Sequence, residues 1–277
     1  EIPGLPFDAF DRQRYYDYFV GKNKRDPTCV EIFDLANCDS NHSRHHDFLS
    51  KIVIDGEEMP ETFMEIVKST WKANPDNSMI AFHDNASAIR GFDCWTLLPD
   101  NPGKVSRFSR QRITYHILFT AETHNFPSGV APYPGAQTGL GGWIRDALNA
   151  GQGSQVLYAL AGYCVGRLNI PDYDLPWEKK FSDFVYPDNL ANALKIAIRA
   201  SDGVSDYGNC FGVPTKGGFF RSFGARLPSG ERVEFIKPVV YVGGGRIIDD
   251  RHIVKGKPER GMRIAQIVGP AYNVGFG

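Results

Sequence analysis

The stretch from Glu122 to Asp146, ETHNFPSGVAPYPGAQTGLGGWIRD, constrains this chain most strongly, because glycines are concentrated there among two acids, a histidine and an arginine. Glycine loses more backbone entropy on folding than any other residue, so this concentration predicts sharp turns or a close approach of the backbone to another group. The segment before it, RITYHILFT, alternates apolar residues such as Ile113 and Phe119 with polar residues such as His116. That period of two predicts a half-buried strand that runs directly into Glu122.

Helical and strand patterns are mixed along the rest of the chain. Apolar spacing and start signals predict helices in PFDAFDRQRYYDYF, DPTCVEIFDLAN, ETFMEIVKSTW and DNLANALKIAIRA, the last of them capped by Asp188. Short apolar runs predict strands in SMIAFH, SQVLYALAGYCVG, KPVVYVGG, MRIAQIVG and AYNV. The prediction is therefore an α+β fold in which helices pack on a mixed β-sheet.

Composition excludes several classes of partner. The chain has 277 residues, and its 31 Lys and Arg nearly balance its 32 Asp and Glu, so no net field favours nucleic acid. No apolar run is long enough to span a membrane. The cysteines are odd in number and lack a C-x-x-C motif, which argues against a disulfide framework and predicts a cytoplasmic protein. Because the chain begins with Glu1 and stops in YNVGFG, we expect it to be a piece of something longer.

The glycine-rich run and its flanking charges form a pattern suited to a nucleotide. Free backbone N–H groups in a glycine-rich turn or a first helical turn can bind phosphate oxygens. Glu122 and Asp146 offer the carboxylate oxygens that Mg²⁺ prefers when it bridges phosphates, and Arg145 can bind an anionic group through two hydrogen bonds. Each feature by itself is also typical of a structural turn or of a surface salt bridge at a helix end.

A second cluster, CDSNHSRHHDF, contains Cys38, His42, His45 and His46. The spacing Cys-x3-His-x2-His invites a zinc interpretation, but the companion ligands of a structural zinc site are missing. A histidine near the cation Arg44 tends to stay neutral, so it can act as a hydrogen-bond acceptor or general base. The plain alternative for His45 and His46 is a solvent-facing position at a helix end.

Six ordered segments that together extend over nearly the whole chain carry a family resemblance. They are LANCDSNHSRHHDF, DNASAIRG, TAETHNFPSGVAPYPGAQTGLGGWIRD, AGYCVGRLNIPDYDLPWE, ASDGVSDYGNCFG and VGPAYNVG. This set resembles the formylglycinamide ribonucleotide amidotransferase (phosphoribosylformylglycinamidine synthase) family in its large single-chain form. The resemblance implies a helical linker over residues 1–47 and, over residues 48–277, an ATP-binding A subdomain like the N-terminal domain of aminoimidazole ribonucleotide synthetase.

The resemblance also implies an activity, namely ATP-dependent conversion of formylglycinamide ribonucleotide to formylglycinamidine ribonucleotide in purine biosynthesis. ATP and Mg²⁺ are the implied cofactors, and the amide oxygen is phosphorylated before ammonia displaces phosphate. Ammonia comes from glutamine in a separate glutaminase domain. No Gly-x-Cys-x-Gly nucleophile is present in this chain, so its partners would include that domain and the remaining synthetase subdomains.

Site roles follow from the resemblance position by position. The implied catalytic residues are His42 and His124, and the implied magnesium ligands are Glu122 and Asp146. Implied substrate-binding residues are Thr123, Asn125, Phe126 and Arg145. Implied ATP-binding residues are His45, Gly135, Ala136, Gln137, Thr138, Gly139, Leu140, Gly141, Gly142, Trp143, Ile144, Arg145 and Asp146.

Asn41 is one departure from the family pattern, which usually has Glu before the first histidine. A missing carboxylate lowers the expected basicity of His42. Two function classes therefore stay open: a catalytic part of the amidotransferase, and a degenerate nucleotide-binding or scaffold domain of the same fold. We further expect the isolated fragment to be inactive and to form a homodimer through its sheet, since the second A subdomain that would pair with it is missing.

Overall fold

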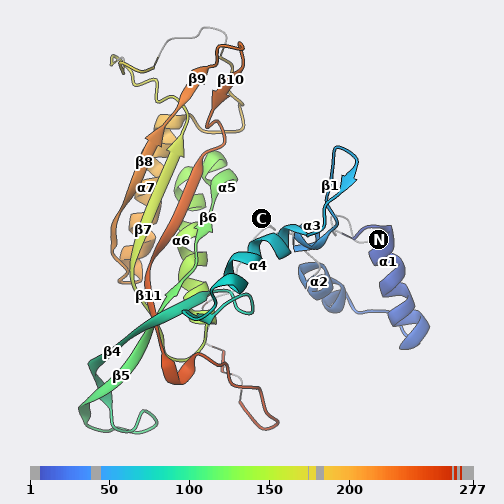
Figure 1. The fold of residues 1–277 in the computed structure, drawn as a ribbon, viewed down its shortest axis with the longest axis vertical. Coiled ribbons are helices and arrows are strands. Elements are labelled where there is room, and N and C mark those ends of the chain that lie inside the picture. The colour runs from blue at the N-terminus through green and yellow to red at the C-terminus, as the bar shows by residue number, and fades with distance from the viewer. Residues whose placement is uncertain are drawn as a thin grey trace. The chain divides into compact units, whose positions relative to one another are not determined.

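A computed structural model describes residues 7–38, 45–173, 175–178, 184–263, 265–266 and 269, with residues 37, 38, 45 and 46 described by their backbone only. The chain forms two compact units, residues 1–76 and residues 77–277 (Figure 1). The predicted domain boundary between residues 47 and 48 stays a prediction.

The first unit is mainly helical. Its elements are α1 (Ala9–Tyr16), the π-helix η1 (Asp17–Lys22), α2 (Cys29–Cys38), α3 (His45–Leu49), β1 (Val53–Ile54), β2 (Glu57–Glu58) and α4 (Phe63–Ala73). Helix starts are fixed by side chains that satisfy free backbone N–H groups. Thr62 and Glu65 form a reciprocal capping box at α4. These helices confirm three of the helical segments predicted from the sequence.

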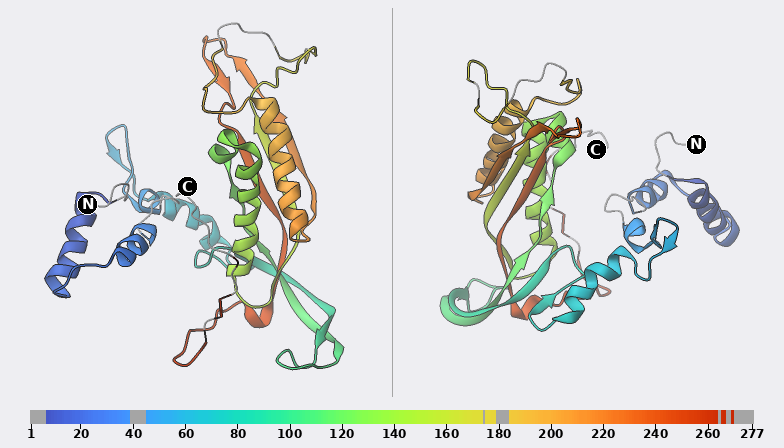
Figure 2. Two further views of the ribbon diagram at one scale, coloured as in Figure 1. Left: turned by 180° about the vertical axis from the view of Figure 1, so that it is seen from behind. Right: turned by 45° about the horizontal axis from the view of Figure 1, so that its top comes forward.

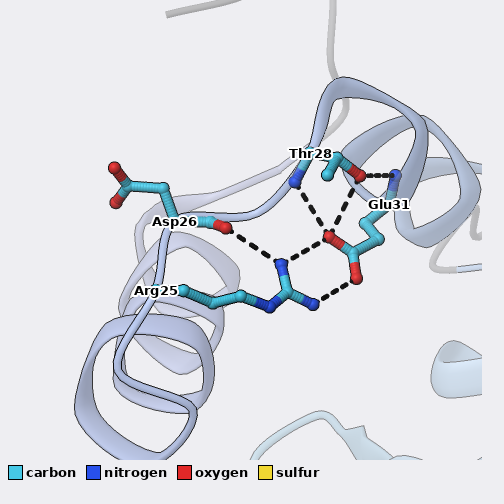
Figure 3. Close-up of polar contacts among 4 residues, drawn as sticks. All are labelled: Arg25, Asp26, Thr28 and Glu31. Atoms are coloured by element: carbon cyan, nitrogen blue, oxygen red, sulfur yellow. Dashed lines mark hydrogen bonds and ion pairs between the residues drawn. The ribbon is translucent and has the colours of Figure 1, made fainter.

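Helix α2 begins with a similar arrangement (Figure 3). The backbone N–H of Glu31 donates to Oγ1 of Thr28 over 3.2 Å, and the N–H of Thr28 donates to the Glu31 carboxylate over 2.8 Å. Arg25 donates to both oxygens of that carboxylate, over 2.8 and 2.5 Å. These hydrogen bonds, the one from Arg25 first, lower the pKa of Glu31 to about 2.

The second unit is built on a seven-stranded mixed sheet with the strand order β3-β4-β5-β11-β7-β8, in which β6 also pairs with β11. The strands are β3 (Ser78–Ile80), β4 (Ser87–Pro99), β5 (Phe108–Phe119), β6 (Glu122–Thr123), β7 (Ser154–Val165), β8 (Thr215–Ser222) and β11 (Val239–Asp249). Among the described strands of this sheet, only β7 and β8 pair in parallel. A separate antiparallel pair joins β9 (Gly224–Arg226) to β10 (Arg232–Glu234).

Three helices cover one face of this sheet, and no described element covers the other face (Figures 1 and 2). They are α5 (Asn125–Val130), α6 (Pro132–Asn149) and α7 (Ala193–Cys210). A short 3₁₀ helix, η2 (Asp250–His252), comes directly after β11 in the chain. Helices α6 and α7 approach closely because Gly203 has no side chain: a Cβ there would lie 2.3 Å from the carbonyl oxygen of Tyr133. The predicted α+β fold with helices packed on a mixed sheet is confirmed.

Strand β5 differs from its predicted pattern. Its fully buried side chains are His116 and Leu118, whereas Phe119 is exposed. The reason is the one-sided helical cover: successive residues of a strand point to opposite faces, and His116 and Leu118 share the face that the helices cover (Figure 2). His116 is satisfied there: Nδ1 accepts from the N–H of Gly91 over 3.2 Å, so Nε2 carries the proton and donates to Asp250 over 2.7 Å.

Two further predictions are wrong in detail. Helix α7 is capped by Asn192 rather than Asp188, and the Asn192 side chain accepts from the N–H of Lys195 over 2.8 Å. The reason is that the N–H of Ala191 donates to Gly129 in α5, so the chain is still turning at that point. The described residues of MRIAQIVG, residues 262, 263, 265, 266 and 269, form no strand, and AYNV lies outside the described residues.

Candidate active site

The segment before α6 is fixed to the middle of the sheet. Strand β5 ends at Phe119, and β6 resumes pairing with β11 through Glu122 opposite Val242. The N–H of His124 then donates to the carbonyl of Val240, and Oδ1 of Asn125 accepts from the N–H of Val240, both over 2.9 Å. These hydrogen bonds give Glu122 and His124 a defined position on the sheet.

Strand alternation separates two of the predicted site residues. Glu122 pairs with Val242, which is fully buried on the helix-covered face, whereas Thr123 pairs with the next residue along the strand, Tyr241. Successive residues of a strand point to opposite faces, so Thr123 lies on the uncovered face, away from Glu122. The implied substrate-binding residue Thr123 and the implied magnesium ligand Glu122 therefore lie on opposite faces of the sheet.

The glycine-rich run is not a loop. Gly135, Gly139, Gly141 and Gly142 all lie inside the 18-residue helix α6, so their amides belong to the helical hydrogen-bond ladder and not to a turn with free N–H groups. The glycines serve close packing instead. A Cβ on Gly139 would lie 3.2 Å from the His124 side chain, and one on Gly142 would lie 3.6 Å from Cδ of Glu122. The predicted cradle of free N–H groups is therefore wrong for this run.

Helix α6 brings Asp146 to Glu122 from the other end of the motif. Asp146 is 5% exposed, and Arg145 beside it donates to Oδ1 of Asp146 over 3.3 Å while most of its own side chain stays exposed. Burial raises the pKa of Glu122 to about 7, helped by the hydrogen bond with Asp146 and by its negative charge, and opposed by the charges of Arg145 and Arg246. The two carboxyl groups form one coupled acidic pair.

His124 completes this group. Its Nε2 lies 3.8 Å from Oε2 of Glu122, and its side chain is 19% exposed. A partly exposed imidazole at the edge of an acidic pair can accept a proton from a bound molecule and is stabilised by the carboxylate when charged. Among the described residues, Glu122, His124, Arg145 and Asp146 are thus the predicted site residues that the fold brings together.

Other predicted residues have different surroundings. Phe126 is half exposed, at 53%. Four of the predicted ATP-binding side chains lie in the hydrophobic core, namely Ala136, Leu140, Trp143 and Ile144. Gln137 donates to Asp206 of α7 over 3.0 Å, and Thr138 bonds back to the carbonyl of Pro134. A nucleotide that touches α6 would therefore meet mainly its exposed side chains, Thr138 and Arg145.

The second predicted cluster is only partly described. His42 and Asn41 lie outside the described residues, and His45 is the first residue of α3, with its side chain outside the description. The four cysteines whose side chains are described, Cys29, Cys94, Cys164 and Cys210, are free. Within the described residues, no cluster of three or more His, Cys, Asp and Glu could hold a metal ion. No helix in the described part of the chain has the length and apolar character of a membrane span.

Arg246 is a residue of this site that the sequence did not reveal. It lies on β11, is 1% exposed, and packs with its guanidinium carbon 4.5 Å from the ring centre of Trp143. Burial lowers its pKa to about 10, although the charges of Asp146 and Glu122 act in the opposite direction. Three glycines precede it in the sequence, but no local pattern indicates that a guanidinium is buried beside the acids.

Comparison with known proteins gives the site its context. The chain is 50% identical over 274 residues to phosphoribosylformylglycinamidine synthase of Dictyostelium discoideum, a match that covers 99% of this chain and 20% of the relative. It is 53% identical to the probable chloroplastic/mitochondrial synthase of Arabidopsis thaliana and 45% identical to the human synthase, covering 19% and 20% of them. The chain is homologous to one segment of the phosphoribosylformylglycinamidine synthases. It spans about a fifth of the length of these relatives.

No protein-family model matches the chain. PurL of T. maritima complexed with ADP matches with a TM-score of 0.44 and 21% identity, covering 90% of this chain and 29% of that protein. The same protein complexed with FGAR matches with a TM-score of 0.39 and 21% identity, covering 90% of this chain and 28% of that protein.

Proposed function

We propose that this chain is the part of a phosphoribosylformylglycinamidine synthase that binds Mg²⁺-ATP and formylglycinamide ribonucleotide. The observation that carries the proposal is the meeting of β6 and α6, where His124 and Arg145 lie beside an acidic pair made of the half-buried Glu122 and the buried Asp146. The relatives named above, at 45–53% identity, bear that enzyme's name. The reaction would couple ATP hydrolysis to the replacement of an amide oxygen by ammonia.

The acidic pair fits Mg²⁺. Burial and a second carboxyl raise the pKa of Glu122 to about 7, so the charges of Arg145 and Arg246 compensate the pair only in part. Mg²⁺ that binds substrate phosphates takes only one or two carboxylates from the protein, so the absence of a three-ligand cluster among the described residues is no objection. Glu122 and Asp146 would hold the ion, and the bound ion would neutralise phosphate charge.

The remaining groups would bind the reactants and move a proton. The exposed guanidinium of Arg145 can donate two hydrogen bonds to an anionic group while its neighbour Asp146 stays on the buried side. His124 can accept the proton that ammonia loses when it attacks the activated amide, because its Nε2 faces Glu122 and its ring is partly exposed. The implied role of His42 as a second active-site histidine belongs to the same proposal.

Substitution of the two acids in the full-length protein tests this function. Glu122→Gln and Asp146→Asn should each lower kcat by about 10²-fold or raise the half-saturating Mg²⁺ concentration by about tenfold, as removal of a metal ligand or charge partner does. Asp202→Asn is the matched control, because this acid lies on the surface of α7, bound to Arg199 over 3.1 Å. A wild-type protein that makes no formylglycinamidine ribonucleotide from glutamine, ATP and substrate would identify the degenerate scaffold domain instead.

The chain by itself should be inactive and should bind Mg²⁺-ATP weakly. It spans about a fifth of its relatives, and a site shared with other subdomains loses preorganised contacts when they are missing. Calorimetry on the chain alone should therefore give an affinity weaker than micromolar. Micromolar binding would show that this part forms a complete nucleotide site. The source of ammonia in a glutaminase domain and the cytoplasmic location predicted from the cysteines belong to the same proposal.

A further inference from the structure

Two glycines, Gly139 and Gly142, form the part of α6 that contacts the β6 segment. Gly139 lies against the ring of His124, and Gly142 lies against Glu122, so no side chain of these two positions interdigitates with the strand. Side-chain interdigitation normally fixes the position of a helix along a neighbouring element. A glycine face next to the acidic pair therefore leaves the relative position of Glu122 and Asp146 to be fixed by other contacts.

Trp143 makes such a contact. Its side chain is fully buried one turn before Ala147, and its indole N–H donates to the carbonyl of Thr120 over 3.2 Å. Thr120 lies just ahead of Glu122 in the link between β5 and β6. The large side chain of the helix that carries Asp146 is thus hydrogen-bonded to the backbone that carries Glu122.

Arg246 contacts both the backbone and the ring of the same tryptophan. Nη1 of Arg246 donates to the backbone carbonyl of Trp143 over 2.9 Å, and its guanidinium stacks 4.5 Å from the ring centre. Gly244 makes room for the indole, since a Cβ there would lie 2.8 Å from Cζ2 of Trp143. The side chain of Arg246 points to the helix-covered face by ordinary strand alternation, because Val242 and Ile248 on the same strand are fully buried there.

Stability alone does not account for a buried arginine at this position. Nε and Nη2 of Arg246 have no hydrogen-bond partner in the described part of the chain, and a buried charge with unsatisfied donors destabilises a fold compared with an apolar side chain of the same size. A buried polar group of this kind is retained where it fixes one specific arrangement, a role attested in other proteins.

We infer that Trp143 and Arg246 are positioning residues for the acidic pair: together with the carbonyl of Thr120 they form a clamp that fixes α6 along β6 and so fixes the distance between Glu122 and Asp146. The inference rests on the proposed function of that pair as the Mg²⁺ site. Both side chains are buried, at 0% and 1% exposed. Both act through the spacing of the two carboxylates, so their loss should weaken metal binding without removing a ligand.

The test uses Trp143→Phe and Arg246→Met in the full-length protein. Trp143→Phe removes the N–H donor while keeping an aromatic ring, and Arg246→Met keeps most of the apolar volume. Ile196→Ala is the control: Ile196 lies in the same core, 1% exposed, on α7, and makes none of the clamp contacts. Each protein is studied at a temperature where denaturant titration shows it fully folded.

Two measurements test the clamp and the proposed metal site independently of each other. Hydrogen exchange without ligand should become at least tenfold faster at residues 120–124 and 143–147 in both clamp variants, and not in Ile196→Ala. Mn²⁺ binding, followed by electron paramagnetic resonance, should weaken about tenfold in the clamp variants and remain unchanged in the control. Unchanged exchange, or equal changes in the control, would overturn the clamp. Mn²⁺ binding that survives Glu122→Gln would instead overturn the metal site, whatever the exchange data show.

Discussion

The side chain of His124 packs directly on Gly139, where an added Cβ would lie 3.2 Å from Cβ and Cγ of the histidine. This contact positions the imidazole between α6 and Glu122, whose Oε2 lies 3.8 Å from Nε2. A helix position without a side chain thus sets the orientation of the proposed general base. The glycine-rich motif is a packing device as well as a candidate ligand site.

His124→Ala should lower kcat of the full-length protein by about 10²-fold or more while leaving the fold intact, because the residue would act as general base in the amide substitution. Product formation and circular dichroism measure the two effects. His83→Ala is the control, since His83 is an exposed residue whose Nδ1 lies 2.8 Å from the carbonyl oxygen of Ala81. An unchanged rate in His124→Ala would remove the residue from catalysis.

The pKa of Glu122 predicts how divalent cation binding depends on pH. The folded value of about 7 lies above the ordinary value of 4.5, so the protonated carboxyl stabilises the fold below about pH 4.5, and this contribution is lost as the pH rises through 7. Metal binding requires the ionised form and so displaces the proton. Mn²⁺ affinity should fall by up to about tenfold per pH unit below pH 7 and level off above it.

Glu122→Gln supplies the control for that titration. The variant has no proton to displace at this position, so its weaker binding should vary much less between pH 6 and pH 8. A wild-type affinity that stays constant over the same interval would contradict the raised pKa of Glu122.

Gly135 and Gly142 form a matched pair within α6 for stability. A Cβ on Gly135 would lie 2.4 Å from the backbone of Pro127, which cannot move aside, whereas one on Gly142 would make only ordinary contacts at 3.6 Å or more. Gly135→Ala should therefore destabilise the protein by about 2 kcal/mol or more. Gly142→Ala should be neutral or stabilise it by up to about 1 kcal/mol, since alanine favours the helix. Urea titration measures both, and equal effects would refute the packing account.

The uncovered sheet face predicts self-association of the chain by itself. Ile89, Ile117 and Ile247 occupy paired positions on it, and Phe219 stacks with Tyr241 at a ring distance of 6.5 Å. A second copy can cover this apolar surface with a two-fold interface, as the second A subdomain would in the parent protein. Sedimentation at about ten micromolar should show a dimer, and Ile117→Lys should shift it toward monomer. A wild-type monomer at every concentration would contradict the proposal.

The sequence predicted the main elements well where the signals are local. The helical spacing of α4 and the apolar run of β7 each lie within one short segment, and both elements form as expected. The cap of α7 was misplaced because Asp188 and Asn192 are both good cap residues and a contact with Gly129, distant in sequence, decides between them.

The candidate site was predictable only in part, because some of its residues are brought together by contacts between segments that are distant in the sequence. Glu122 and Asp146 flank one motif, so their types and the family resemblance were enough to propose them. Arg246 lies on a strand about 100 residues further along and reaches the site only through the pairing of β11 with β5 and β6. The separation of Thr123 from Glu122 likewise follows from strand register, which no pattern within the motif contains.

Crystallography of the full-length protein with Mn²⁺ and a non-hydrolysable ATP analogue shows directly whether Glu122 and Asp146 bind the metal ion. Anomalous scattering locates the ion independently of activity. The account predicts a Mn²⁺ peak about 2.1 Å from a carboxylate oxygen of Glu122 and from one of Asp146, with the remaining positions filled by phosphate oxygens and water. An ion bound to the phosphates elsewhere, with neither Glu122 nor Asp146 among its ligands, would contradict this assignment.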